Sequence, residues 1–231
     1  RGERTQKGRF REFYQCDIDV IGDGELSILN DAELPSVIYT VFKRLGFDNF
    51  TIRINNRKLL NGLFIEIGQE DNSTEILRII DKIDKIGKEA VESELLRLNL
   101  NKEHVKKIMK FILIQGTNQE KIQQLEELKI ENEQFNQGLE EIKQVLKYVG
   151  IFGVPEGNYQ LDLTIARGLD YYTGTVYETF LNDYRELGSV CSGGRYENLA
   201  DYYTDKKLPG VGISIGLTRL FYKLNELQLI K

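Results

Sequence analysis

The pattern of apolar and polar positions predicts strands toward both ends of the chain and helices between them. β-strands are predicted in five stretches, at residues 9–20, 50–55, 159–165, 175–181 and 210–216. Helical spacing predicts further elements at residues 31–45, 56–68, 75–86, 132–149 and 217–229. We expect Asn30 or Asp31 to cap the first of these helices, with Pro35 in its first turn and its end at Gly46.

A change in amino-acid composition divides the chain into two parts. From residue 71 to residue 149 the sequence is polar, helix-favouring and free of proline, whereas strand-like stretches return at residue 159. We interpret residues 71–149 as an all-helical insertion domain. Residues 1–70 and 150–231 then form one discontinuous core domain.

The strand at residues 9–20 sorts its side chains onto two faces. The face expected to meet the core carries Tyr14, Cys16, Ile18 and Val20. The opposite face carries Arg9, Arg11, Phe13, Gln15, Asp17 and Asp19. Gln15 and Asp19 would lie about 13 Å apart at roughly 3.3 Å per residue, far enough to hold opposite ends of one small ligand. The alternative is an ordinary solvated strand face.

Residues 166–174 combine an arginine with two adjacent tyrosines between glycines. Arg167 can bind phosphate or carboxylate through a planar fork, and the hydroxyls of Tyr171 and Tyr172 can donate or accept hydrogen bonds. A buried salt bridge beside two half-buried tyrosines would explain the same residues. Because flanking strands place this stretch at strand ends, where sites collect, we favour a binding site.

Two glycine-rich stretches follow. Residues 190–197 are expected to form a strand that runs into a glycine turn and then a helix. Residues 210–216 alternate glycine or serine with Val211, Ile213 and Ile215, and the next helix carries Arg219 in its first turn. The spacing is not that of a dinucleotide-binding loop. A strand with one bare face suits a flat base or sugar, although tight strand–helix packing is the alternative.

Composition and charge argue against a general nucleic-acid binder, a zinc protein and a membrane-spanning protein. The chain has 231 residues, 41 % of them hydrophobic, with a net charge of -5, so its overall field does not attract nucleic acid or an acidic membrane. RNA contact would need a local patch such as the helical row of Lys102, Lys106 and Lys110 with Lys107 beside it, although most such rows are only solvated helix faces. Two distant cysteines and one histidine argue against a zinc site and fit a cytoplasmic setting. No run is long and apolar enough to predict a membrane helix.

Taken together, four ordered motifs resemble histidyl-tRNA synthetases, which are class II aminoacyl-tRNA synthetases. Residues 1–15 resemble the class-wide motif 2, residues 166–172 and 192–196 resemble two histidine-specific signatures, and residues 210–219 resemble motif 3. The resemblance implies an α+β fold: a class II antiparallel sheet with flanking helices, interrupted by a helical domain near the tRNA acceptor arm. It also implies activation of L-histidine with ATP, then transfer of histidine to its tRNA.

The resemblance assigns roles to individual residues. Arg1 and Arg167 would reach the α-phosphate and the histidine carboxylate, with Arg167 the more nearly catalytic of the two. The ATP site would include Arg1, Glu3, Arg9, Phe13 and Arg219, with Mg2+ beside the terminal phosphates. The histidine site would include Gln15 for the α-amino group, Asp19 and Tyr172 for the imidazole ring, and Tyr171 and Arg167 in the same pocket.

The chain departs from the full family pattern at both ends. Residue 1 is not methionine, and we expect a preceding segment with the dimer-forming motif 1 and a following anticodon-binding domain. The full-length protein would be a homodimer, and we do not expect this fragment by itself to be active.

The alternative interpretation is that the chain belongs to a non-catalytic relative, either a regulatory subunit of histidine biosynthesis or a tRNA-sensing domain. Such relatives would be expected to lose pocket arginines.

Overall fold

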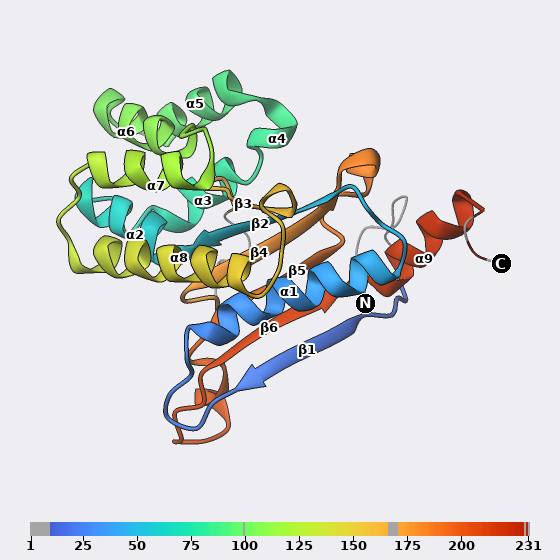
Figure 1. Cartoon of the computed structure of the whole chain (residues 1–231). Helices are drawn as coiled ribbons and strands as arrows, with labels where there is room; N and C mark the ends of the chain where they lie inside the picture. The colour runs from blue at the N-terminus through green and yellow to red at the C-terminus, as the bar shows by residue number, and fades with distance from the viewer. Residues whose placement is uncertain (1–9, 99, 166–170, 229, 231) are drawn as a thin grey trace.

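A computed structural model describes residues 10–98, 100–165, 171–228 and 230. These residues form a six-stranded mixed sheet with helices around it, in the strand order β1-β6-β5-β4-β2-β3 (Figure 1). Each strand is antiparallel to its neighbours, except that β2 and β3 run parallel. The fold class predicted from the sequence, α+β with a mainly antiparallel sheet, is confirmed.

The strand bounds agree with most of the predicted stretches, although the strand predicted at residues 9–20 begins only at Cys16. The strands are β1 (Cys16–Ile21), β2 (Phe50–Asn56), β3 (Tyr159–Leu161), β4 (Thr175–Leu181), β5 (Cys191–Tyr196) and β6 (Gly210–Ile215). The predicted strand at 159–165 is shorter than expected, because Asp162 turns the chain by accepting hydrogen bonds from the backbone and hydroxyl of Thr164.

The helices occupy the predicted regions. They are α1 (Leu29–Arg44), α2 (Arg57–Glu66), α3 (Ser73–Ile80), α4 (Ile83–Ile86), α5 (Lys88–Arg97), α6 (Lys102–Ile112), α7 (Asn118–Glu127), α8 (Glu133–Ile151) and α9 (Leu217–Glu226). Short 3-10 turns follow at η1 (Glu156–Asn158), η2 (Asn182–Leu187) and η3 (Leu199–Tyr202). The helix expected at 75–86 is divided, because residues 81 and 82 form a turn between α3 and α4.

The helical segment 71–149 is not packed as one separate block. Helices α3 to α7 gather beyond α2 and α8, while α8 packs against both α1 and α2 (Figure 1). Gly62 in α2 and Gly138 in α8 permit this close crossing, since a Cβ atom at Gly62 would lie 2.6 Å from Phe135. The proposed domain boundaries at residues 71 and 149 stay a prediction.

A buried ion pair holds α1 against one face of the sheet. Asp31 in the first turn of α1 is 0 % exposed and faces Arg195 of β5, which is 6 % exposed, with 2.7 Å between Oδ2 and Nη2. The same Nη2 donates to the carbonyl oxygens of Leu26 and Ser27, and the hydroxyl of Tyr177 donates to the Asp31 carbonyl at 2.7 Å. Burial raises the pKa of the Asp31 carboxyl, and the hydrogen bonds from Arg195 oppose that rise. We call this face the back face of the sheet.

Three sequence-based expectations about local structure are wrong. Helix α1 begins at Leu29, so neither Asn30 nor Asp31 caps it and Pro35 lies beyond its first turn. Asp31 serves the ion pair instead. Tyr14 and Cys16 are exposed rather than in the core, because residue 14 precedes β1 and pairs with the start of α9 through Thr218. The third error concerns Gly193 and Gly194.

Gly193 and Gly194 lie inside β5, not in a turn. Both pair with β4 and with β6, and neither has a positive φ angle. A Cβ atom at Gly193 would lie 2.0 Å from the carbonyl oxygen of Gly212, which no side chain tolerates. Close approach of strands therefore explains these glycines, whereas turn geometry was the expectation.

Removal of the Asp31 carboxylate should destabilise the fold strongly. Asp31→Ala leaves the buried guanidinium of Arg195 without its partner, and we expect the free energy of unfolding to fall by about 3 to 5 kcal/mol in urea denaturation. Glu33→Ala, two residues further on the exposed side of α1, is the matched control and should change it by less than about 0.5 kcal/mol. Equal losses in the two variants would show that the ion pair does not anchor α1.

Candidate functional site

Strand register places the candidate residues on the face opposite α1, which we call the front face. One row across it runs from Asp19 through Gly212 and Gly194 to Val176. The next row runs from Asp17 through Ser214 and Ser192 to Glu178 and Arg53. Because side chains alternate along each strand, Asp19 and Asp17 share this face as the sequence pattern predicted.

Glycines clear the space in which three of the polar side chains lie. A Cβ atom at Gly212 would lie 1.9 Å from Asp19 Oδ1, and one at Gly210 would lie 2.4 Å from the ring of Tyr196. One at Gly194 would lie 2.9 Å from the ring of Tyr172. The bare face of β6 was predicted to receive a flat ligand, yet part of it is covered by the protein's own Asp19 and Tyr196.

Asp19 and three tyrosines form one cluster. Tyr196 donates a hydrogen bond of 2.8 Å to Asp19 Oδ1, and Tyr171 donates one of 3.0 Å to the hydroxyl of Tyr172. The rings of Tyr171 and Tyr172 have centroids 4.3 Å apart, and the ring of Tyr196 meets that of Tyr171 edge-on at 6.4 Å. Two chain segments about 150 residues apart therefore meet here.

The cluster presents one acceptor and one donor to a ligand. Within the described part of the chain, the second carboxylate oxygen of Asp19 has no hydrogen-bond partner. Since the Tyr172 oxygen already accepts from Tyr171, its own hydrogen remains for a ligand. Burial raises the pKa of Tyr172, and the charge of Asp19 raises it further. Burial and the bond to Asp19 likewise raise the pKa of Tyr196, so these phenols keep their protons at neutral pH.

A cavity of about 310 Å3 connects this cluster with the start of α9. Its lining includes Tyr171 and Tyr172 at one side, Glu178 and Ser192 of the second front-face row, and Arg219. Arg219 donates to the carbonyl oxygen of Ser189, which orients its guanidinium group. The cavity thus places a cation, a buried carboxylate and two phenols around one space.

The structure brings together most of the described site residues that the sequence predicted. Tyr171, Tyr172 and Arg219 line the cavity, and Asp19 lies beside them. Gln15 donates through Nε2 to the hydroxyl of Ser214 at 2.6 Å, on the front face. Phe13 is 46 % exposed and is not among the residues of the cavity wall. The predicted site residues Arg1, Glu3, Arg9 and Arg167 lie outside the described residues.

The second signature, residues 192–196, sends its two large side chains to opposite faces of the sheet. Arg195 points to the back face and belongs to the ion pair with Asp31. Tyr196, one position further along β5, points to the front face and bonds Asp19. Period-two alternation could have separated these two residues once the stretch was recognised as a strand. Glu178 was missed, although a charge within the apolar stretch 175–181 is itself a signal.

The predicted lysine row lies on the surface of the helical segment. Lys102, Lys106 and Lys110 are exposed along α6 beside a shallow groove, and their contact with RNA stays a prediction. Among the residues that the structure describes, no three histidine, cysteine, aspartate or glutamate side chains converge on a possible metal position. In the same residues no helix combines the length and the apolar character that crossing a bilayer requires.

Known proteins match the chain over nearly its whole length. The family model for histidyl-tRNA synthetase matches residues 1–220. A histidine–tRNA ligase of Clostridium tetani is 63 % identical over 230 residues, which is 100 % of this chain and 52 % of the relative.

Two solved structures are similar to the chain. That of histidyl-tRNA synthetase from Nostoc sp. PCC 7120 superimposes with a TM-score of 0.92 and 45 % identity, covering 96 % of this chain and 52 % of that one. A second structure, described as an ATP phosphoribosyltransferase regulatory subunit/histidyl-tRNA synthetase from Bacillus halodurans C, shares the fold with a TM-score of 0.76 at 24 % identity, over 91 % of this chain and 53 % of that one. The chain spans about half the length of the curated relatives it matches. The extent and identity of these matches establish that the chain belongs to the histidyl-tRNA synthetase family.

Proposed function

We propose that the protein to which this chain belongs is a histidine–tRNA ligase, and that the front face is its histidine and ATP site. The observation that carries the proposal is the pairing of a free acceptor on Asp19 with a free donor on Tyr172. A neutral imidazole ring has one N–H donor and one nitrogen acceptor, so it satisfies both groups at once. Family membership supports the same function.

Selectivity follows from the cost of leaving these groups unpaired. An amino acid without two ring nitrogens would bury the Asp19 carboxylate or the Tyr172 hydroxyl without a partner. A site that hydrogen-bonds its substrate in this way can discriminate by a factor of about 10^4 to 10^5 without a separate editing step. Gln15 is placed on the same face, where its amide could accept from the α-amino group of histidine.

The proposed reaction has two steps. An oxygen of the histidine carboxylate attacks the α-phosphorus of ATP, a P–O bond forms, and pyrophosphate leaves. A ribose hydroxyl at the tRNA 3′ end then attacks the histidyl carbonyl carbon, AMP leaves, and the hydroxyl proton passes to the departing phosphate. Two anions meet in the first step, so fixed cations matter more than a general base. We assign that role to Arg167 and Arg1 on the resemblance of their motifs.

ATP and Mg2+ would occupy the cavity on the Arg219 side. Arg219 and Arg9 would neutralise the terminal phosphates, Glu3 would contribute to the same site, and Phe13 would stack on the adenine. Mg2+ commonly takes one or two carboxylates together with substrate phosphates, and the Glu178 carboxylate on the cavity wall fits that need. When bound, the metal would neutralise charge on the phosphates.

Partners and setting are proposed on the same grounds. We expect a homodimer with L-histidine, ATP and histidine tRNA as substrates. A cytoplasmic location fits the two free cysteines, Cys16 and Cys191. The rival, a regulatory relative, has weaker support because the structure whose title names a regulatory subunit is 24 % identical, whereas the ligase of Clostridium tetani is 63 % identical.

The first test is histidine-dependent exchange of pyrophosphate into ATP by the full-length protein. Asp19→Ala removes the acceptor for the imidazole N–H, and we expect the KM for histidine to rise about tenfold or more while that for ATP changes little. Asp23→Ala, which removes an exposed carboxylate from the turn after β1, is the control and should behave as the unaltered protein. No histidine-dependent exchange in the unaltered protein would refute the proposed function, and equal rises for both substrates would refute the role of Asp19.

The second test concerns the orientation of Asp19. Tyr196→Phe keeps the ring but removes the donor to Asp19 Oδ1, so the carboxylate loses its fixed direction. We expect the KM for histidine to rise by roughly tenfold and kcat to change less. In a double-mutant cycle with Asp19→Asn, the two losses should not add, because both variants break one interaction. Additive losses would show that Tyr196 acts independently of Asp19.

A further inference from the structure

The end of β2 carries a fully buried asparagine on the front face. Asn55 is 0 % exposed and pairs with Val176 of β4, so it extends the front-face row that begins at Asp19. An amide group in such a position costs free energy unless it is hydrogen-bonded. The partners of Asn55 therefore indicate what the residue contributes to this face of the sheet.

Both ends of the Asn55 amide are bonded to backbone groups. Its Nδ2 donates to the carbonyl oxygen of Ile165 at 3.1 Å, and its Oδ1 accepts from the N–H of Asn56 at 2.8 Å. The backbone at Asn56 is fixed in turn, because the side chain of Asn56 caps α2 by accepting from the N–H of Lys58 at 2.9 Å. A rigid part of the fold thus directs the Asn55 donor toward Ile165.

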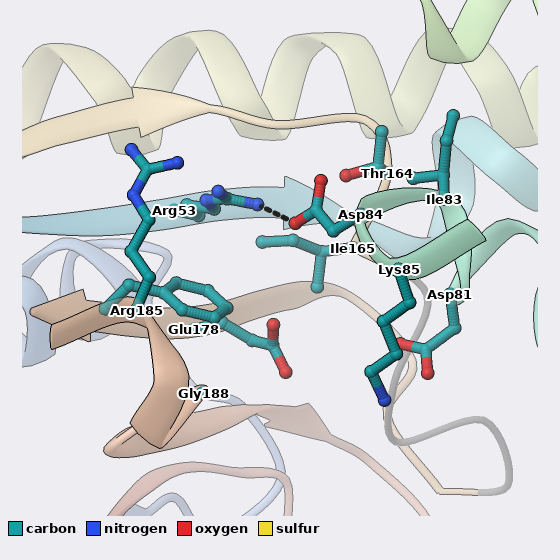
Figure 2. A pocket seen from close by; sticks show the side chains of 11 residues that line it. Arg53, Asp81, Ile83, Asp84, Lys85, Thr164, Ile165, Glu178, Arg185 and Gly188 are labelled. Carbon is teal, nitrogen blue, oxygen red and sulfur yellow. Dashed lines mark hydrogen bonds and ion pairs between the residues drawn. The ribbon is translucent and has the colours of Figure 1, made fainter. Parts of the chain in front are cut away.

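The two residues before Asn55 hold the same turn of the chain. The carbonyl oxygen of Ile54 accepts from the N–H of Asp162 at 2.8 Å. Arg53 bonds the carboxylate of Asp162 at 3.1 Å and that of Asp84 in α4 at 2.8 Å. Figure 2 shows the bonded pair of Arg53 and Asp84 beside Ile165. Three successive residues of β2 therefore fix the turn that ends at Ile165.

The chain is also held directly after the two tyrosines of the candidate site. The N–H of Arg57, at the start of α2, donates to the carbonyl oxygen of Gly174 at 2.9 Å. The N–H of Thr173 donates to the carbonyl oxygen of Arg195 in β5 at 2.8 Å. Tyr172 immediately precedes these two residues. The junction between β2 and α2 thus binds the chain on both sides of the tyrosines.

These anchors matter because recognition of an imidazole ring depends on one distance. Tyr172 and Asp19 can both bond the ring only if they stand one ring apart, since N–H···O hydrogen bonds form at about 2.7 to 3.2 Å. Asp19 is oriented by Tyr196, whereas the ring of Tyr172 lies against Gly194. Ile165 and Tyr172 line the same cavity. A shift of the backbone at Ile165 would therefore change the wall on which the position of Tyr172 depends.

We propose that Asn55 is a positioning residue for the recognition of histidine. It holds the carbonyl oxygen of Ile165, and this keeps the Tyr172 hydroxyl at the distance from Asp19 that one imidazole ring spans. The inference rests on the proposed function, to which the two imidazole contacts belong. Asn55 acts through other residues, because its hydrogen bonds go to backbone atoms and its side chain is not among those that line the cavity.

The first experiment removes the Asn55 donor in the full-length protein. In histidine-dependent pyrophosphate exchange, Asn55→Ala should raise the KM for histidine about tenfold and the KM for ATP less than about twofold. Asn158→Ala is the matched control, because Asn158 Nδ2 donates to the carbonyl oxygen of Phe50 at 3.0 Å, at the other end of β2. It removes the same kind of bond from the same strand, and the KM for histidine should stay within about twofold of that of the unaltered protein.

The second experiment tests whether Asn55 acts through the Tyr172 hydroxyl. Tyr172→Phe removes that hydroxyl and keeps the ring. In this background Asn55→Ala should raise the KM for histidine by less than about twofold, although it raises the KM about tenfold when made alone. A loss of stability without a positioning role would raise the KM by the same factor in both backgrounds, and that result would overturn the inference.

The remaining outcomes are equally decisive. An unchanged KM for histidine in folded Asn55→Ala overturns the inference, and so does an equal rise in Asn158→Ala or an equal rise for ATP. If Asn55→Ala does not fold, Asn55→Ser replaces it, because the shorter serine side chain fills more of the space but falls short of the Ile165 carbonyl. Failure of both variants to fold would assign Asn55 to stability alone. Absence of exchange in the unaltered protein refutes the proposed function, and the inference with it.

Discussion

The buried pair of Asp31 and Arg195 is the constraint on which the rest of the architecture depends. It commits the side chain of Arg195 to the back face of β5, where α1 covers it, and strand alternation then sends Gly194 and Tyr196 to the front face. A charge pair this deeply buried is stable only when both partners are present. The same interaction that docks α1 therefore decides which side of the sheet is available for a ligand.

Close approach of the strands sets the form of the front face. Gly194, Gly210 and Gly212 leave room for Tyr172, Tyr196 and Asp19 to lie across the backbone of their neighbours. A side chain at Gly212 would occupy the position of the Asp19 carboxylate. The glycines thus act less as flexible points than as spaces reserved for polar groups, and the hydrogen bond from Tyr196 then orients the carboxylate.

The site is composite. Asp19 comes from β1, whereas Tyr172, Tyr196 and Arg219 lie about 150 to 200 residues later in the chain. The helical segment between them is joined to the sheet where Arg53 of β2 bonds Asp84 of α4.

Local patterns could be predicted wherever one periodicity or one motif decided the outcome. The strand at 175–181, the helix after Asn56, the front-face position of Asp19 and the family resemblance were all available from the sequence. Contacts between residues far apart in the sequence could not be predicted in this way. The sequence does not show that Asp31 meets Arg195, that Gly193 and Gly194 continue a strand, or that Tyr14 pairs with α9 instead of entering the core.

The physical reason for this division is the range of the interactions concerned. Periodicity and capping act within a few residues, so they are written directly in the sequence. An ion pair between residues 31 and 195, or a glycine required by a neighbouring strand, depends on elements that meet only after folding. The sequence by itself determined the front-face position of Asp19 and, through its motifs, the family. Only the tertiary structure decided that Tyr196 orients Asp19 while Arg195 holds α1 against the other face of the sheet.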